Sequence, residues 1–352
     1  MALRARLVFC LIAIVGLTTE AQLHAQSRSV ELDLTGGYSG EEIRAAAVQA
    51  RAFGQVDLRS QIQYFGEVAW GQRWSEEAMV GQPLFGADPM GSDVFGAAYP
   101  YRDKFQVIEA YAERTFRPRG ALLGVRAGQY RTPFGIYSRS DYGYSGFIRP
   151  PLIRYDGYYG LSNNYMERGA MLTAGVPRLY VEASLGKPHD VGSSQRRDGT
   201  DGSVRVQGYH KSLIIGVSHA RSEPYLPSYF AHGRQVFTGA DARWTHASGV
   251  QLRGEFFHGQ SFTGVTTNGW YVDGVLHHVG MGPFTAVARV ESLAYTAAAP
   301  FARSEDRVTL GTRLRLPRDL MAQLNYMHQH GDLPRIYDNA VDLTLTYSFR
   351  YR

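Results

Sequence analysis

The sequence predicts an all-β fold, a transmembrane antiparallel up-and-down β-barrel of about sixteen strands. Three observations predict it: side chains alternate with a period of two along short segments, the connections alternate in length, and the composition is unusual. The chain has 39 Gly, 23 Tyr and 17 Phe with a mean hydropathy of only −0.27. Such a composition suits a barrel whose polar interior offsets an apolar exterior. No segment approaches the roughly 18 consecutive apolar residues of a spanning helix.

The N-terminal segment has the pattern of a secretory signal peptide. Arg4 and Arg6 precede an apolar run at residues 7–17, and small residues follow at Ala21 and Ala25. The run is much shorter than the roughly 20 apolar residues that a spanning helix needs. We therefore expect cleavage after Ala25, with Ala21 as the alternative site.

Cleavage at that point divides the chain into a signal peptide at residues 1–25 and the barrel at residues 26–352. The only cysteine, Cys10, lies in the signal peptide. We therefore expect no disulfide, thiol catalysis or cysteine metal site in the mature chain.

The C-terminal segment NAVDLTLTYSFRYR gives the clearest strand. Val341, Leu343 and Leu345 share one face, while Asp342 and Thr344 share the other. The same alternation predicts strands at 29–38, 44–56, 61–74, 104–115, 120–130, 166–175, 178–186, 203–209, 212–221, 236–246, 250–259, 269–280, 284–295, 305–316, 320–330 and 339–351. The first three alternate only weakly, so fourteen or eighteen strands remain alternatives.

The connections between these segments alternate in length. Short joints such as 117–119 and 317–319 are interleaved with longer ones such as 75–103 and 131–165. Bacterial outer-membrane barrels have short periplasmic turns and longer external loops. A soluble propeller should repeat near every forty residues, which this chain does not, and a sandwich gives no reason for one-sided loop lengths. We therefore expect export to the bacterial outer membrane, with the apolar face against outer-membrane lipid.

The longest connection, residues 131–165, is rich in Tyr, Gly, Pro and Arg. Loops longer than about 15 residues are uncommon unless they are functional or disordered, and the aromatic residues argue against disorder. We expect this loop, which follows the fifth strand, to fold into the lumen and narrow it; an outward adhesive or receptor loop is the alternative. The residues expected at the constriction or in contact with solute are Arg131, Arg139, Arg149, Arg154, Tyr142, Tyr144 and Tyr155.

The charges predict a balanced wall and a basic loop. Assigning the apolar faces to lipid leaves arginines and acidic residues in equal number on the inner positions, which most simply form cross-strand pairs. The predicted channel-wall residues are Arg126, Arg243, Arg253, Arg289, Arg313, Arg315, Glu109 and Glu255. The loop sets its four arginines against Asp141 and Asp156, a net +2 (four minus two). Such charge at the narrowest point favours a mild anion preference, although the loop tyrosines suit stacking on sugars equally well.

A resemblance to a known family begins at residue 105 and ends at residue 155. The run FQVIEAYAERTFRPRGALLGVRAGQYRTPFGIYSRSDYGYSGFIRPPLIRY, with the element GQYRTPFG at Gly128–Gly135, resembles bacterial outer-membrane porins of the phosphate-selective porin O and P group and its uncharacterised relatives. The resemblance implies a channel of 16 strands, often a homotrimer, with a constriction loop after strand five. The dense arginine and lysine arrays of the phosphate-selective members have no residue-by-residue match in this chain.

Together these patterns predict a porin, a water-filled channel for passive diffusion of small hydrophilic solutes with a mild, phosphate-like anion preference. We expect no enzyme, cofactor or metal, because KPHD (His189, Asp190) and LHHVG (His277, His278) come without a serine motif or HExxH. No basic stripe interleaved with aromatic residues indicates nucleic-acid binding. The alternative is a plugged or structural surface barrel whose external loops bind a partner or act as a hydrolase.

Overall fold

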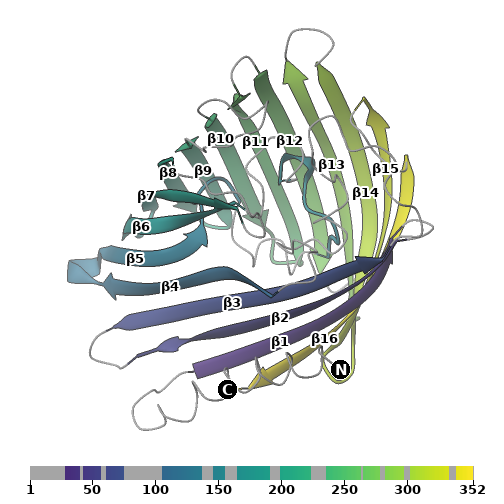
Figure 1. The fold of residues 1–352 in the computed structure, drawn as a ribbon, viewed down its shortest axis with the longest axis horizontal. Helices are drawn as coiled ribbons and strands as arrows, with labels where there is room; N and C mark the ends of the chain where they lie inside the picture. The colour runs from purple at the N-terminus through teal and green to yellow at the C-terminus, as the bar shows by residue number, and fades with distance from the viewer. Residues whose placement is uncertain are drawn as a thin grey trace.

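A computed structural model describes residues 28–39, 43–56, 61–74, 105–136, 146–154, 165–190, 199–222, 235–262, 265–277, 282–296, 302–332 and 338–351. Sixteen antiparallel strands close into one barrel, in which each strand pairs with its neighbours in sequence and the first pairs with the last (Figure 1). The predicted fold class and strand number are confirmed, and the alternatives of fourteen and eighteen strands are wrong.

The strands are β1 (Arg28–Ser39), β2 (Ile43–Gln55), β3 (Ile62–Trp74), β4 (Gln106–Phe116), β5 (Leu122–Arg131), β6 (Tyr165–Val176), β7 (Leu179–Asp190), β8 (Asp201–His210), β9 (Leu213–Ser222), β10 (Gln235–Thr245), β11 (Val250–Phe262), β12 (Val265–His277), β13 (Phe284–Thr296), β14 (Arg303–Leu316), β15 (Leu320–Gly331) and β16 (Asn339–Tyr351). Two short 3₁₀ helices, η1 (Pro118–Gly120) and η2 (Leu152–Arg154), complete the described elements. No helix in the described part of the chain is long and apolar enough to cross a membrane.

Two boundaries differ clearly from the predicted ones. Strand β7 continues past residue 186 because its polar end still pairs with β6, where His189 opposes Met166. Strand β12 begins before residue 269 because Thr266 and Thr267 pair with β11 and β13. Backbone pairing needs no apolar side chain, so a strand end made of polar residues gives no alternation signal.

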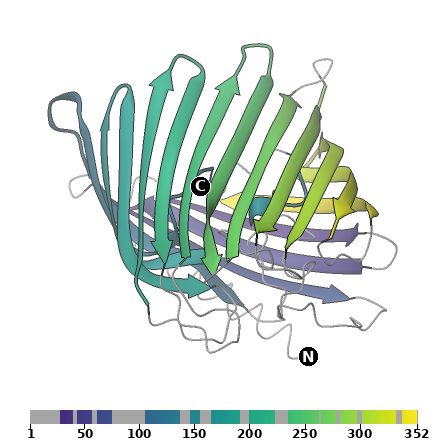
Figure 2. The same ribbon diagram turned by 90° about the horizontal axis from the view of Figure 1, so that it is seen from above.

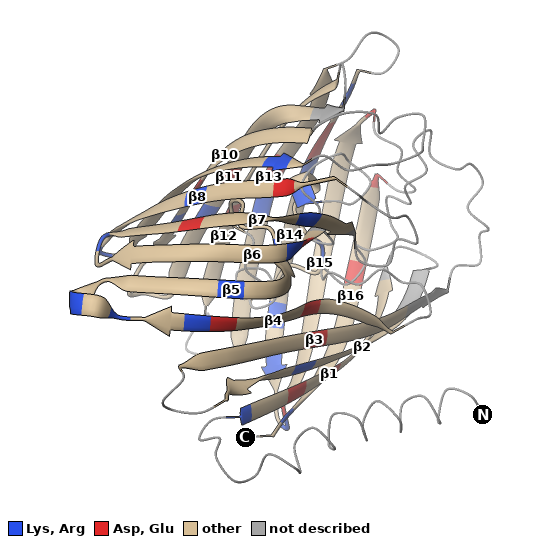
Figure 3. Cartoon of the chain, turned by 60° about the vertical axis from the view of Figure 1, so that its left-hand side comes forward, with Lys and Arg blue, Asp and Glu red and all other residues tan. Residues whose placement is uncertain are grey.

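The two faces of the sheet have opposite character. On β16, the alternate residues Val341, Leu343 and Leu345 are each 48% exposed, whereas Asp342 and Thr344 are buried. Because the sheet is closed, the exposed face is the outside of the barrel and the buried face is the inside. Figure 3 shows the charged residues placed along the strands. This distribution, with apolar groups outside and charges inside, is the reverse of a soluble core and is typical of a transmembrane barrel.

The closing seam between β1 and β16 is held on both faces. Leu32 opposes Phe349 on the outside. On the inside, Asp33 accepts a hydrogen bond from the Ser348 hydroxyl at 2.7 Å. It also forms an ion pair with Arg51 of β2. Cross-strand pairs of this kind fix the register of a sheet, so the seam closes in one alignment.

The connections that follow the even-numbered strands lie at one end of the barrel, which we call the short-turn end (Figure 2). All of these connections are short, as η1 is between β4 and β5. Two connections at the other end are short as well: residues 40–42 between β1 and β2, and residues 263–264 between β11 and β12. Four of the connections after even-numbered strands place non-glycine residues at positive φ: Gln61 at 53°, Arg119 at 46°, Lys211 at 52°, and Arg318 at 61° beside Asp319 at 57°. The loop of residues 132–164 follows β5 and therefore lies at the opposite end, the long-loop end.

Close pairing of β10 and β11 predicts a specific sensitivity at Gly259. A Cβ there would collide with the carbonyl oxygen of Val236 and would lie 2.7 Å from the Cα of Phe237. We expect Gly259→Ala to lower the free energy of unfolding by about 1–3 kcal/mol, since backbone must shift. Gly66→Ala is the matched control, because nothing lies within 4 Å of a Cβ at that position. Urea unfolding of the refolded proteins measures both, and equal losses would contradict this strand pairing.

Candidate functional site

Two segments of the predicted loop, residues 132–136 and 146–154, lie on the inner face of the barrel wall formed by β9 to β16. The first segment begins this contact where the Gly135 amide donates a hydrogen bond to the Ser218 hydroxyl of β9 at 2.9 Å. The second packs through η2 against β12 and β13, as the teal helix in Figure 1 shows. We call these two segments the docked loop.

The wall supplies hydrogen bonds to the backbone of the docked loop. Asn325 of β15 accepts from the Ile148 amide at 2.6 Å and donates to the Gly146 carbonyl at 3.1 Å. Arg307 of β14 donates to the Pro150 carbonyl at 2.6 Å. Buried backbone groups require partners, and here side chains of the wall satisfy groups that no strand pairs.

Ion pairs attach the loop arginines to wall carboxylates. Arg149 contacts Asp342 of β16 at 2.5 and 2.8 Å, and its side chain is only 4% exposed. Arg154 pairs with Glu255 of β11 and is 5% exposed. Both pairs are shielded from water, so removing one partner would leave a buried charge uncompensated, at a cost of about 3–5 kcal/mol.

Arg289 of β13 links the wall to the loop through three kinds of contact. Its guanidinium lies 4.0 Å from the ring centroid of Phe147 and donates to the Arg149 carbonyl at 2.9 Å. It also donates to Asp273 of β12 at 2.6 Å, and Asp273 pairs with Arg253 of β11 at 2.5 Å. One carboxylate therefore holds two wall arginines, and one of these arginines holds the loop.

Apolar side chains of the loop fit over glycines of the wall. The ring of Phe134 lies over Gly239 of β10, where an added Cβ would come within 2.8 Å of it. Ile153 lies over Gly269 of β12 in the same way, at 2.5 Å. The buried cluster formed around them contains Phe134, Ile136, Leu152, Ile153, Ala220, Phe237, Phe257, Tyr271, Leu293 and Tyr295. The absence of side chains at the two glycines allows the loop to approach the wall this closely.

Each predicted loop arginine that the structure describes is paired. Arg131, at the end of β5, contacts Glu109 of β4 at 3.3 Å, and Arg149 and Arg154 are paired as above. Arg139, Tyr142, Tyr144 and Tyr155 lie outside the described residues. The arginines were predicted to lie at the constriction or to contact solute, and this stays a prediction. Arg149 and Arg154 attach the loop to the wall, whereas Arg131 pairs across the neighbouring strands β5 and β4.

The predicted wall residues fall into three environments. Arg253 and Arg289 are buried in the network under the loop, together with Glu255, and Arg313 is buried beside Thr285. Arg126 pairs with Glu113 on β4 at 2.6 Å and is partly exposed, as is Arg243 of β10. Arg315 is exposed at the short-turn end of β14, and Glu109 is buried against Arg131.

Sequence reasoning missed the wall residues that receive the loop. Asp342 and Glu291 were recognised only as inward-facing charges, and Asn325 was not singled out. Glu291 accepts a hydrogen bond from the Leu152 amide, and the two residues are 139 positions apart. Alternation along a strand shows which side chains point inward, but it contains no signal for a partner so distant in sequence.

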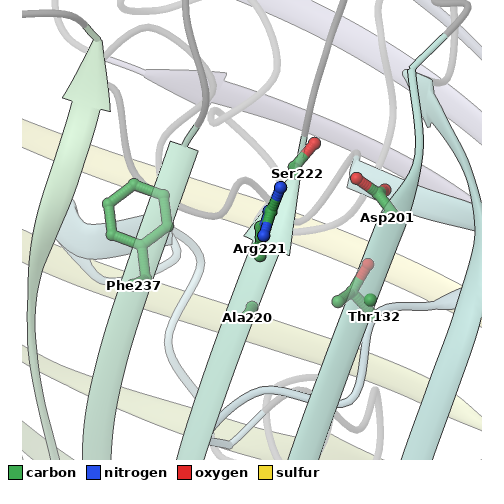
Figure 4. Close-up of a pocket in the computed structure, with 7 residues that line it drawn as sticks. Thr132, Asp201, Ala220, Arg221, Ser222 and Phe237 are labelled. Atoms are coloured by element: carbon green, nitrogen blue, oxygen red, sulfur yellow. The ribbon is translucent and has the colours of Figure 1, made fainter.

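A small pocket lies beside the docked loop at the long-loop end (Figure 4). Its volume is about 10 Å³, roughly the room that one water molecule needs, and its lining residues are Thr132, Asp201, Gly202, Ala220, Arg221, Ser222 and Phe237. This volume is below the roughly 300–1,000 Å³ of typical ligand sites, so the pocket is not our candidate for solute binding. Among the described residues, no group of three or more His, Cys, Asp or Glu side chains could hold a metal ion.

The described strands define the fold class of the protein, a closed antiparallel barrel of sixteen strands with a loop docked on its inner wall. No family model and no curated protein matches the sequence. Similar solved structures include OprB of Pseudomonas putida (TM-score 0.61, 10% identity, 92% of this chain and 93% of that chain) and OmpF of Salmonella typhi in complex with daunomycin (0.58, 9%, 92% and 97%). OmpT of Vibrio cholerae is also similar (0.57, 9%, 92% and 97%). At these identities the likeness shows the fold alone.

The prediction that the chain is not an enzyme was wrong, because the findings do not exclude an enzyme. The similar structures include several of OmpT, described as an outer membrane protein of Vibrio cholerae, beside structures described as porins. Proteins with different descriptions therefore share this barrel fold. The fold alone cannot rule out catalysis in this chain. Missing sequence motifs do not rule it out either, because catalytic groups can be assembled from distant strands.

The position of the loop can be tested with a disulfide. Residues 26–352 contain no cysteine. The contact of Ile153 with Gly269 places their Cβ atoms about 4 Å apart or less, as a disulfide requires. We expect the double variant Ile153→Cys/Gly269→Cys to crosslink under mild oxidation and to lose reactivity toward a thiol reagent.

The matched control is Ile153→Cys/Gly274→Cys, because residue 274 occupies the outer-face register of the same strand. This pair should stay reduced, so that both thiols react once the protein is unfolded in denaturant. Equal crosslinking of both pairs, or of neither pair, would contradict the docked position of the loop.

Proposed function

We propose that this protein is an outer-membrane porin, a water-filled channel through which small hydrophilic solutes pass by passive diffusion. The observation that carries the proposal is the closed barrel of sixteen strands with exposed apolar side chains outside and charged side chains inside. A barrel of this strand number is wide enough for an aqueous channel, whereas an eight-stranded barrel is filled by its own side chains.

Uneven burial of the inner charges supports an open channel narrowed from one side. The ion-paired side chains of Arg307 and Glu291, on the wall beneath the docked loop, are 0% exposed. The pair formed by Arg126 and Glu113, on β5 and β4, is 16% and 17% exposed. Water therefore reaches Arg126 and Glu113, whereas the loop shields the wall at β13 and β14. Other inner charges on the side of β4 and β5, such as Glu67 and Glu167, are also buried.

Export and assembly complete the proposal. The pattern of residues 1–25, which lie outside the described residues, supports a cleaved signal peptide, and the apolar outer face suits outer-membrane lipid. Assembly as a homotrimer is supported by the family resemblance and by a similar structure, OmpT of Vibrio cholerae in a trimer form (TM-score 0.55, 10% identity).

We propose a weaker anion preference than the loop sequence alone predicts. Arg149 and Arg154 are neutralised by Asp342 and Glu255, so the basic surplus counted within the loop is offset by carboxylates of the wall. A balanced set of charges at a constriction gives weak discrimination between anions and cations. We therefore propose a channel whose selectivity is small.

We also propose that the chain is related to the phosphate-selective porin O and P group. The geometry explains the GQYRTPFG element on which this resemblance rests. In GQYRTPFG, Phe134 occupies the space over Gly239, and Gly135, at a φ of 58°, passes so close to Glu255 that a side chain there would collide with it. These residues fit the loop to the wall. The signature therefore supports a shared loop position and implies nothing about phosphate.

The proposal predicts conductance from the refolded mature protein in a planar bilayer. We expect stepwise openings and, in a salt gradient, a reversal potential close to zero. Arg149→Ala should move the reversal potential toward the cation side, because it removes a positive charge and leaves Asp342 without this partner.

Arg114→Ala is the control with the same loss of charge, since Arg114 is exposed and its guanidinium lies 4.7 Å from the ring centroid of its outer-face neighbour Phe116. It should leave the reversal potential unchanged. Absence of any conductance from folded protein would refute the porin and favour the plugged barrel. Equal shifts from both variants would refute a lumenal role for Arg149.

A further inference from the structure

Three aromatic side chains form a row on the inner wall away from the docked loop. They are Phe53 on β2, Phe65 on β3 and Tyr111 on β4, which we call the aromatic row. Phe53 opposes Phe65 and Phe65 opposes Tyr111 in the strand register. The rings of Phe65 and Tyr111 are stacked, with centroids 5.4 Å apart and planes at 27°. In the closed strand order, β2 to β4 lie across the barrel from β10 to β12 (Figure 1).

The period of the strands places this row inside the barrel. Phe53 follows Arg51 by two positions, and Tyr111 precedes Glu113 by two. Arg51 and Glu113 face inward, where both form ion pairs with neighbouring strands. Residues two apart share a face of a strand, so the row faces the lumen and lies in the half toward the short-turn end.

These rings are exposed although they face inward. Phe53 is 46% exposed, and Phe65 and Tyr111 are partly exposed. Apolar surface facing water is unfavourable by roughly 25 cal/mol per Å², and lipid cannot cover it here as it covers the outer face. A contiguous exposed apolar patch rimmed by polar groups is typical of a ligand-binding surface.

Charged groups beside the row can bind hydroxyl groups. The guanidinium of Arg126 lies 4.2 Å from the ring centroid of Tyr111 and donates to Glu113 at 2.6 and 2.8 Å. At the other end of the row, Arg51 pairs with Glu31. Arg51 also pairs with Asp33, and Glu67, two positions from Phe65, accepts a hydrogen bond from Gln49. Acidic groups therefore outnumber arginines beside the row, so it disfavours anions while offering hydrogen-bond donors and acceptors next to flat apolar surfaces.

The backbone of β5 holds Tyr111 in its place. Gly128 has a φ of 135°, and a Cβ there would lie 2.9 Å from the Cβ of Tyr111. Because Gly128 begins the GQYRTPFG element, one short segment both seats Tyr111 on this wall and leads into the docked loop. The site and the constriction are therefore built by the same piece of chain.

We propose that the aromatic row is a binding site for neutral carbohydrates within the channel. A sugar ring presents an apolar face of C–H groups that stacks on aromatic rings, and its hydroxyl groups surround that face, as the charged pairs surround the row. An anionic solute would gain no net attraction from this set of charges. The site rests on the proposed function, because solute reaches it only through an open channel.

Current block by a sugar tests this site. The probe is maltohexaose, added to both sides of a bilayer that contains open channels of the mature protein. We expect it to reduce the current saturably. Phe65→Ala and Tyr111→Ala should each weaken this block about tenfold, on the order of a lost aromatic contact. Phe53→Ala, at the most exposed ring of the row, should fold normally and weaken the block in the same direction.

Phe284→Ala is the matched control, since Phe284 is 47% exposed on the outer face toward the short-turn end. It should leave the block unchanged. Channels that conduct without any block by maltohexaose would overturn the site but not the porin, as would equal affinity in all variants or stronger block by inorganic phosphate. Failure to conduct before sugar is added would overturn the proposed function itself.

Discussion

The buried ion pairs between the loop and the wall are the constraint on which the interior of this barrel depends. Arg149 with Asp342, and Arg154 with Glu255, place charges in nearly dry surroundings. Such charges are tolerated only when they are paired, so each pair admits few positions of the loop. The glycines beneath Phe134 and Ile153 add a steric requirement to the electrostatic one. The loop is therefore attached to the wall of β9 to β16.

This one-sided attachment gives the two walls different chemistry. Beneath the loop, arginines such as Arg289 bind carboxylates, loop carbonyls and aromatic rings. On the facing wall, the charges pair with one another, and the aromatic row remains exposed beside them. A solute in the channel would thus pass a surface of stacked rings and neutralised charges. Selection of solutes by charge and binding of sugar rings by aromatic side chains are separate properties of such a channel. Because its arginines are paired, we expect binding of sugar rings to matter more than charge.

The strands could be predicted from sequence because side chains alternate across a sheet whatever the distant partners are. The segment of β16 showed this directly, whereas β2 was difficult because IRAAAVQARAFGQ alternates through small residues. The same rule places Phe53, Phe65 and Tyr111 inside the barrel although they are apolar, because each lies two positions from a charged residue that faces inward. The loop could be recognised as long and ordered. Its attachment could not be predicted, because Arg149 and Asp342 are 193 positions apart and no local pattern joins them.

The central claim is that the channel conducts with its loop already fixed to one wall. The most direct measurement compares the unitary conductance of the Ile153→Cys/Gly269→Cys variant before and after oxidation. If the loop occupies this position in the conducting state, the disulfide will leave the unitary conductance unchanged and reduce only its fluctuations. A large fall or rise in conductance on oxidation, reversed by reduction, would show that the conducting channel holds its loop elsewhere and would contradict the account.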